Sequence, residues 1–267
     1  MIVEKENKLL EILRDYGSVV VAFSGGVDSS VLSKAAKLVL GDKAAAITAA
    51  SELLPKEELT DAKEVAAIIG IEHKVISVQD LANPKFVVND RERCYYCKEK
   101  RFALLTTWAQ EHGYQKVVEG SNLDDDGDYR PGMRALREND FVASPLAIAG
   151  FNKKDIRNLA KKWNLPVWNK PSAACLASRI SYGLEITADR LKQVEHAEQI
   201  IRQYVQGQLR VRHHGNLARI EVATEFLPTL LDHDVNEEII REIKKIGFTY
   251  VTLDLQGYRM GSQNEIL

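Results

Sequence analysis

The chain has 267 residues, of which 45% are hydrophobic and 28% are charged, the composition of an ordinary globular protein. Its formal net charge of −2 argues against a general nucleic-acid binder, which usually carries a basic excess. No uncharged apolar stretch approaches the ~20 residues of a membrane span, and the N-terminus shows no signal peptide. We therefore expect a cytoplasmic protein with neither a membrane nor a nucleic acid as partner.

The first 180 residues alternate between apolar runs and helical patterns. Four apolar runs predict strands, and they cover residues 18–23, 43–50, 72–78 and 116–120. Helices are expected after the first strand and at about residues 55–69 and 95–112. This β–α alternation predicts an α/β domain over residues 1–180, with a parallel sheet and helices on both faces.

The pattern changes near Ser181, beyond which strands follow one another without an intervening helix. Two strands, at residues 209–213 and 218–222, favour an antiparallel sheet. The remaining elements expected are helices at residues 187–204 and 236–246 and a strand at residues 248–253. We expect residues 181–267 to form a smaller α+β domain that binds substrate or serves oligomerisation.

Residues 24–29 read Ser-Gly-Gly-Val-Asp-Ser directly after the first strand. Gly25 and Gly26 let the backbone approach an anion, and the helix N-terminus offers unpaired N–H groups. Ser24 and Ser29 add hydroxyl donors, and Asp28 adds a carboxylate suited to Mg²⁺ or a nucleotide. The loop lacks the lysine and the spacing of a Walker A motif. It resembles the PP-loop of the ATP pyrophosphatases, which cut ATP between its α and β phosphates; the alternative is a serine-capped helix behind a glycine turn.

An acidic loop, residues 120–132, follows the fourth strand and reads GSNLDDDGDYRPG. Its four aspartates repel one another, so they need water, cations or arginine nearby. Asp124, Asp125 or Asp128 would lie beside Mg²⁺–ATP, or the loop is simply solvated. Ligands of parallel sheets bind beyond the carboxyl ends of the strands, where Ser51 and Ser121 also fall. The candidate nucleotide-binding residues here are Ser51, Gly120, Asp125 and Arg130.

Three cysteines form the next candidate site. Cys94 and Cys97 are three residues apart at a helix start and can ligate one metal centre. Together with Cys175 they suit a 4Fe–4S cluster, whose fourth iron would stay open for sulfide or substrate. Zinc would need a fourth ligand, a redox dithiol would need only the pair, and buried cysteines can be plain core residues.

Arg210, Arg212 and His214 alternate along one predicted strand, so they share a face. Nearby Glu198 and Arg219 could orient the guanidinium groups. Because arginine binds phosphate through two hydrogen bonds, this face predicts a seat for a phosphorylated substrate, with a solvated charged face as the alternative.

Together these motifs resemble the LarE family of PP-loop sulfur transferases, which serve biosynthesis of the nickel-pincer nucleotide, the lactate racemase cofactor. The resemblance runs across nearly the whole chain. It is carried by SGGVDS at residues 24–29, EGSNLDDDGDYRPG at 119–132, WNKPSAACLASRISYG at 168–183 and LRVRHHGNLARIE at 209–221. It implies ATP-dependent conversion of the carboxylates of pyridinium-3,5-biscarboxylic acid mononucleotide to thiocarboxylates.

The resemblance also implies roles for residues. Cys94, Cys97 and Cys175 match a three-cysteine branch whose catalytic cysteines hold a 4Fe–4S cluster, whereas a one-cysteine branch sacrifices its own sulfur. The residues that the resemblance implies for binding the substrate phosphate are Arg210, Arg212, Ser178 and Glu198. ATP, Mg²⁺ and sulfide or another sulfur donor are the implied ligands, and a homo-oligomer, a hexamer, is the implied assembly. The alternatives are a PP-loop tRNA thiolase and a non-catalytic iron–sulfur or nucleotide-binding regulator.

Overall fold

The computed structural model describes residues 2–125, 131–171 and 174–266. The chain divides into two compact units. Unit 1 comprises Met1–Gln79 and Cys94–Ser172, and unit 2 comprises Asp80–Arg93 and Ala173–Leu267. No helix within the described ranges is both long enough and apolar enough to cross a membrane.

Unit 1 is built on a five-stranded sheet with the order β3-β2-β1-β4-β5, in which every pairing is parallel. The strands are β1 (Val19–Ala22), β2 (Ala44–Ala50), β3 (Glu72–Ser77), β4 (Lys116–Val118) and β5 (Val142–Ala143). The parallel α/β sheet predicted from the sequence is confirmed. Only β5, two residues long at the edge, had no counterpart among the predicted strands.

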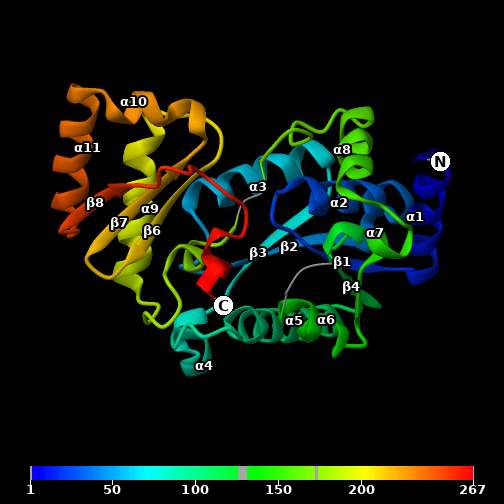
Figure 1. The fold of residues 1–267 in the computed structure, drawn as a ribbon. Coiled ribbons are helices and arrows are strands. Elements are labelled where there is room, and N and C mark those ends of the chain that lie inside the picture. Colours follow the sequence, from blue (N-terminus) through cyan, green and yellow to red (C-terminus); the bar gives the residue numbers. More distant parts are fainter. Residues whose placement is uncertain (1, 126–130, 172–173, 267) are drawn as a thin grey trace. The chain divides into compact units, whose positions relative to one another are not determined.

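The helices of unit 1 are α1 (Ile2–Tyr16), α2 (Val27–Leu40), α3 (Lys56–Ile69), α5 (Arg93–Glu111), α6 (Pro131–Arg137), α7 (Pro145–Ile148) and α8 (Lys153–Lys162). They cover both faces of the sheet, as Figure 1 shows for α2 and α3 on one side and α5 and α6 on the other. Successive residues of a strand point to opposite faces. Val19 and Val21 therefore pack with α1, α2, α3 and α8, whereas Val20 packs with α5 and α6.

Unit 2 carries a three-stranded sheet of order β6-β7-β8, the smaller α+β sheet that the sequence predicts. Strands β6 (Leu209–His214) and β7 (Leu217–Val222) are antiparallel, whereas β8 (Tyr250–Leu253) runs parallel to β7. The parallel pairing arises because a helix returns the chain between β7 and β8. The helices of this unit are α4 (Pro84–Val87), α9 (Ala188–Arg202), α10 (Leu227–Leu231) and α11 (His233–Lys245).

Helix α11 begins three residues before the predicted start at residue 236. The reason is its cap: Asp232 accepts hydrogen bonds from the backbone N–H groups of Asp234 and Val235 at 3.2 and 3.3 Å. An aspartate at this position satisfies donors that the first helical turn leaves free.

Candidate active site

The phosphate loop lies between β1 and α2 and is held by its own serines. The hydroxyl oxygens of Ser24 and Ser29 are 3.1 Å apart, and the Ser29 hydroxyl donates to the Gly26 carbonyl at 3.2 Å. Gly25 has a φ of +70°, and a Cβ there would lie 2.8 Å from the Cα of Ala62 in α3. Only glycine fits at that position, so the loop is preformed against α3.

Asp28, in the first turn of α2, forms an ion pair with Lys153, the first residue of α8. The other carboxylate oxygen of Asp28 is buried and has no hydrogen-bond partner among the described residues. The backbone N–H of Lys153 also donates to Asp124 at 2.9 Å. Lys153 therefore connects the phosphate loop with the acidic loop, a role that no local motif in the sequence indicates.

The carboxyl end of β4 packs directly against the start of α2. A Cβ on Gly120 would lie 3.0 Å from the Cβ of Asp28 and 3.2 Å from the backbone nitrogen of Ser29. The neighbouring Glu119 is buried, and its carboxylate accepts from both the backbone N–H and the hydroxyl of Ser121, at 3.1 and 2.7 Å. Sequence reasoning missed Glu119 as a residue that shapes this edge of the sheet.

The acidic loop is partly described. Asp125 accepts a hydrogen bond from the backbone N–H of Asn122 at 2.9 Å, so it stabilises the turn that opens the loop. Asp126, Asp128 and Arg130 lie outside the described residues. The choice of a Mg²⁺ ligand among these aspartates therefore stays a prediction.

Ser51 lies just beyond the carboxyl end of β2, as expected for a residue at the ligand-binding edge. Its hydroxyl accepts a hydrogen bond from a guanidinium nitrogen of Arg101 at 2.7 Å. Arg101, on α5, also donates to the Ala49 carbonyl at 3.1 Å and thus places a positive charge at this edge.

The three cysteines are not in disulfide bonds; Cys94 and Cys175 are exposed and Cys97 is half-buried. Cys94 and Cys97 lie in the first turns of α5, three residues apart as the sequence predicts. Cys175 directly precedes a 3₁₀ turn, Leu176–Arg179, in unit 2. Within either unit, the described residues hold no group of three or more His, Cys, Asp or Glu side chains arranged around a metal position.

Unit 2 brings Arg210 and Arg212 together with a third arginine, Arg179. Arg210 is 5% exposed, and burial together with the nearby Arg179 charge lowers its pKa to about 10. The Glu198 carboxylate forms two hydrogen bonds with Arg179, at 2.9 and 3.1 Å. Glu198 lies near Arg210 but pairs directly with Arg179, which sequence reasoning did not single out.

Arg212 is held by a buried carboxylate. Its Nε and Nη2 donate to one oxygen of Glu221 at 3.0 and 2.8 Å, and Arg219 donates to the other oxygen at 3.0 Å. Glu221 is fully buried and also accepts from the Ser262 hydroxyl at 3.0 Å. In the β6–β7 register, Arg210 lies opposite Glu221 and Arg212 opposite Arg219, so all four share one face. Glu221 could have been identified as a partner of these arginines from the hairpin register, because the register places it opposite Arg210.

The segment that carries Cys175 is tied to these arginines. The Ser178 carbonyl accepts from Arg212 at 3.1 Å, and the Ser178 hydroxyl donates to the Cys175 carbonyl at 2.7 Å. Arg179 donates to the same carbonyl at 2.9 Å. Unit 2 thus holds one cysteine beside the residues predicted to bind a substrate phosphate.

The two histidines of β6 differ in role. His213 packs against Phe248, and burial together with the nearby Arg190 charge lowers its pKa to about 4. Its Nδ1 accepts from the Gly215 N–H at 3.2 Å. His213 is therefore a neutral packing residue near pH 7, whereas His214 lies 2.7 Å from the Ser181 hydroxyl through its Nδ1.

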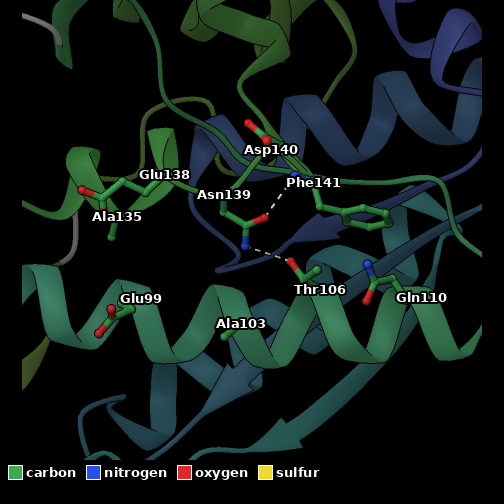
Figure 2. A pocket seen from close by; sticks show the side chains of 9 residues that line it. All are labelled: Glu99, Ala103, Thr106, Gln110, Ala135, Glu138, Asn139, Asp140 and Phe141. Atoms are coloured by element: carbon green, nitrogen blue, oxygen red, sulfur yellow. Dashed lines mark hydrogen bonds between the residues drawn. The ribbon is translucent and has the colours of Figure 1, made fainter.

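A separate pocket of about 610 Å³ lies in unit 1 between α5 and residues 135–141 (Figure 2). Its walls are tied by Asn139, whose amide donates to Thr106 at 3.1 Å and accepts from the Phe141 N–H at 3.1 Å. None of the residues that the sequence predicts for the site lines this pocket.

The NAD synthase family model matches residues 2–119. The chain is 41% identical to an uncharacterized protein of Synechocystis sp., with 98% of both chains covered. It is 36% identical to the pyridinium-3,5-bisthiocarboxylic acid mononucleotide synthase of Lactiplantibacillus plantarum, covering 98% of this chain and 95% of the synthase. It is 33% identical to an uncharacterized protein of Methanocaldococcus jannaschii, with 97% of both chains covered.

Proposed function

We propose a function on the premise that the chain belongs to the LarE family of PP-loop, ATP-dependent sulfur transferases, as its 36% identity over 98% of its length shows. The substrate proposed is pyridinium-3,5-biscarboxylic acid mononucleotide, whose carboxylates become thiocarboxylates. The observation that carries this proposal is the preformed phosphate loop, with Gly25 packed on Ala62, in a chain similar to the synthase over nearly its full length.

The reaction begins with activation. A carboxylate resists attack because oxide is a poor leaving group, and adenylation replaces it with AMP. The loop amides and the start of α2 would receive the pyrophosphate charge that develops. Lys153, beside Asp28, supplies a positive charge that the loop itself lacks because no Walker lysine is present.

A Mg²⁺ ion fits the donors at the start of α2. Asp28 has a buried carboxylate oxygen without a hydrogen-bond partner among the described residues, and a hard oxygen donor of this kind suits Mg²⁺. Asp28 would hold the ion, and Lys153 would then be free to turn to a phosphate.

The substrate phosphate would bind in unit 2. Arg210 is buried and Arg212 is oriented by Glu221, so both guanidinium groups have little conformational freedom to lose when a phosphate binds. Ser178 adds a hydroxyl beside Cys175, and Glu198 fixes Arg179. Preorganised guanidinium groups bind phosphate through paired, charge-assisted hydrogen bonds.

The cysteines fit a 4Fe–4S cluster in donor chemistry, because none of the three is in a disulfide bond and thiolates are the usual ligands of such clusters. When bound, such a cluster supplies an iron with an open coordination position for the sulfur to be transferred. The task of this chain's own residues is to hold Cys175 close to the substrate seat, which the hydrogen bonds from Ser178 and Arg179 to its carbonyl support. We further propose a homo-oligomer, which light scattering on the purified chain tests.

The test uses anaerobically purified protein with ATP, Mg²⁺, sulfide and the pyridinium mononucleotide. Mass spectrometry should find stepwise exchange of one oxygen for sulfur at each carboxylate, and chemical analysis should find iron and sulfide bound to the chain. Unmodified tRNA serves as the competing substrate. Sulfur appearing in tRNA and not in the mononucleotide would establish the thiolase alternative instead.

A further inference from the structure

Two helices of unit 1 hold opposite ends of the phosphate loop. Gly25 packs on Ala62 of α3, and Asp28 pairs with Lys153 at the start of α8. Helix α2, which begins at the loop, packs against both α3 and α8 (Figure 1). A change in the spacing between α3 and α8 would therefore move one end of the loop relative to the other.

The start of the WNKPSAACLASRISYG motif joins these two helices. Arg157 of α8 donates to the backbone carbonyls of Trp168 and Lys170 at 2.8 and 2.9 Å. The Lys170 ammonium in turn forms ion pairs with two carboxylates of α3, Glu58 at 2.8 Å and Asp61 at 2.7 Å. One connection from α8 to α3, the Lys170 bridge, is thus formed by Arg157, Lys170, Glu58 and Asp61.

The Lys170 bridge lies close to the loop on both helices. Asp61 directly precedes Ala62, on which the loop packs, and Arg157 lies one helical turn after Lys153. The Lys170 side chain is only 19% exposed, and it binds two carboxylates at once. A partly sheltered ion pair that is shared among several charges constrains its partners more than an isolated surface pair does.

We propose that Lys170 is a positioning residue of the phosphate loop: the bridge fixes α3 relative to α8 and so keeps Gly25 and Asp28 at the spacing that the phosphates of ATP require. The proposal rests on the ATP-dependent activation of the proposed function. Backbone N–H groups bind phosphate best when they are already aligned. Loss of the bridge should therefore weaken ATP binding although no group that touches ATP has been removed.

The first test measures the dissociation constant of ATP by calorimetry in variants of the bridge. Lys170→Met and the double variant Glu58→Gln/Asp61→Asn each break the bridge from one side, so each should weaken ATP binding about tenfold, within the range of such indirect couplings. Their combination should weaken binding no further, because both act on one connection. Lys170→Arg keeps the ion pairs and should bind ATP as the unmodified protein does.

The direction of the change separates positioning from a charge effect. Lys170→Met leaves two carboxylates without their cation, which by charge alone would repel ATP. Glu58→Gln/Asp61→Asn leaves the cation without its carboxylates, which by charge alone would attract ATP. The bridge predicts weaker binding in both variants. A Lys170 that acts through its charge, or that touches the phosphates itself, predicts weaker binding in Lys170→Met alone.

The matched control is Lys162→Met, at the other end of α8. Lys162 forms an ion pair with Glu6 of α1, so its removal breaks a contact of α8 that does not lead to α3. The affinity for ATP should not change in this variant.

The second test restores the connection without its charges. In protein whose three cysteines are replaced by serine, Lys170→Cys and Asp61→Cys are joined by a short bismaleimide. ATP binding should be weak before cross-linking and should recover after it. If Lys170→Met does not fold, the cross-linked protein and Glu58→Gln/Asp61→Asn, whose carboxylates lie nearer the surface, decide the question.

The outcomes separate the two proposals. Unchanged ATP affinity in Lys170→Met, or weaker binding in that variant alone, would overturn the bridge while leaving the proposed function intact. Unmodified protein that binds ATP but transfers no sulfur would overturn the proposed function, and the affinities would still decide whether the bridge positions the loop.

Discussion

Replacement of Glu221 by glutamine tests the buried charge network of unit 2. Glu221 is fully buried and receives hydrogen bonds from Arg212, Arg219 and Ser262, all at 3.0 Å or less. Glutamine keeps the shape but removes the only carboxylate that the described structure places against Arg212. Removing one partner of a buried ion pair leaves an uncompensated charge and costs about 3–5 kcal/mol.

The assay is urea unfolding at neutral pH, followed by circular dichroism. Glu221→Gln should lower the free energy of unfolding of unit 2 by about 3–5 kcal/mol. The control is Glu242→Gln, on the exposed face of α11, which should cause no measurable change in that free energy. Adding up the separate hydrogen bonds of Glu221 would overstate the loss of stability, because bonds within one network are not additive. A variant as stable as the unmodified protein would refute the view that Glu221 holds Arg212 in place.

Three further predictions concern the phosphate loop and β6. Gly25→Ala should abolish ATP binding in calorimetry, because the new Cβ would meet Ala62 at 2.8 Å and a φ of +70° costs an alanine about 1–2 kcal/mol; undiminished ATP binding would contradict this reasoning. Lys153→Met should lower AMP formation about 100-fold by removing the cation beside Asp28, and Lys153→Arg should retain most of the rate; equal rates would contradict this role. His213 has its pKa lowered from 6.5 to about 4, so the unfolded state binds the extra proton first and stability should fall by up to about 3 kcal/mol as pH drops from 6.5 to 4. His213→Gln should flatten that decline in urea titrations, and an unchanged slope would rule out His213 as its source.

The parallel sheet of unit 1 was predictable because its signals are local. Val19, Val20 and Val21 are all fully buried, and an uninterrupted apolar run of this length is typical of a strand covered on both faces. The phosphate loop was predictable for the same reason, since six adjacent residues carry the whole motif. The antiparallel pairing of β6 and β7 follows from the short turn between them.

The side-chain partners in the site were not predictable, because they join residues far apart in the chain. Lys153 reaches Asp28 across 125 positions, and a single lysine gives no periodic or spacing signal. Glu198 was expected beside Arg210, but only the folded 3₁₀ turn before Ile180 brings Arg179 to its carboxylate. The sequence likewise gives no sign that residues 80–93 group with unit 2, because that grouping depends on Asn89 and its contacts with residues 180–184.

The central claim is that this chain activates a carboxylate as an acyl adenylate before sulfur transfer. The most direct measurement is the nucleotide product formed with ATP, Mg²⁺ and the pyridinium mononucleotide, separated by chromatography and compared with the thiocarboxylate formed. The account predicts AMP and pyrophosphate, one AMP for each thiocarboxylate, and none without the mononucleotide. Formation of ADP and phosphate would contradict it.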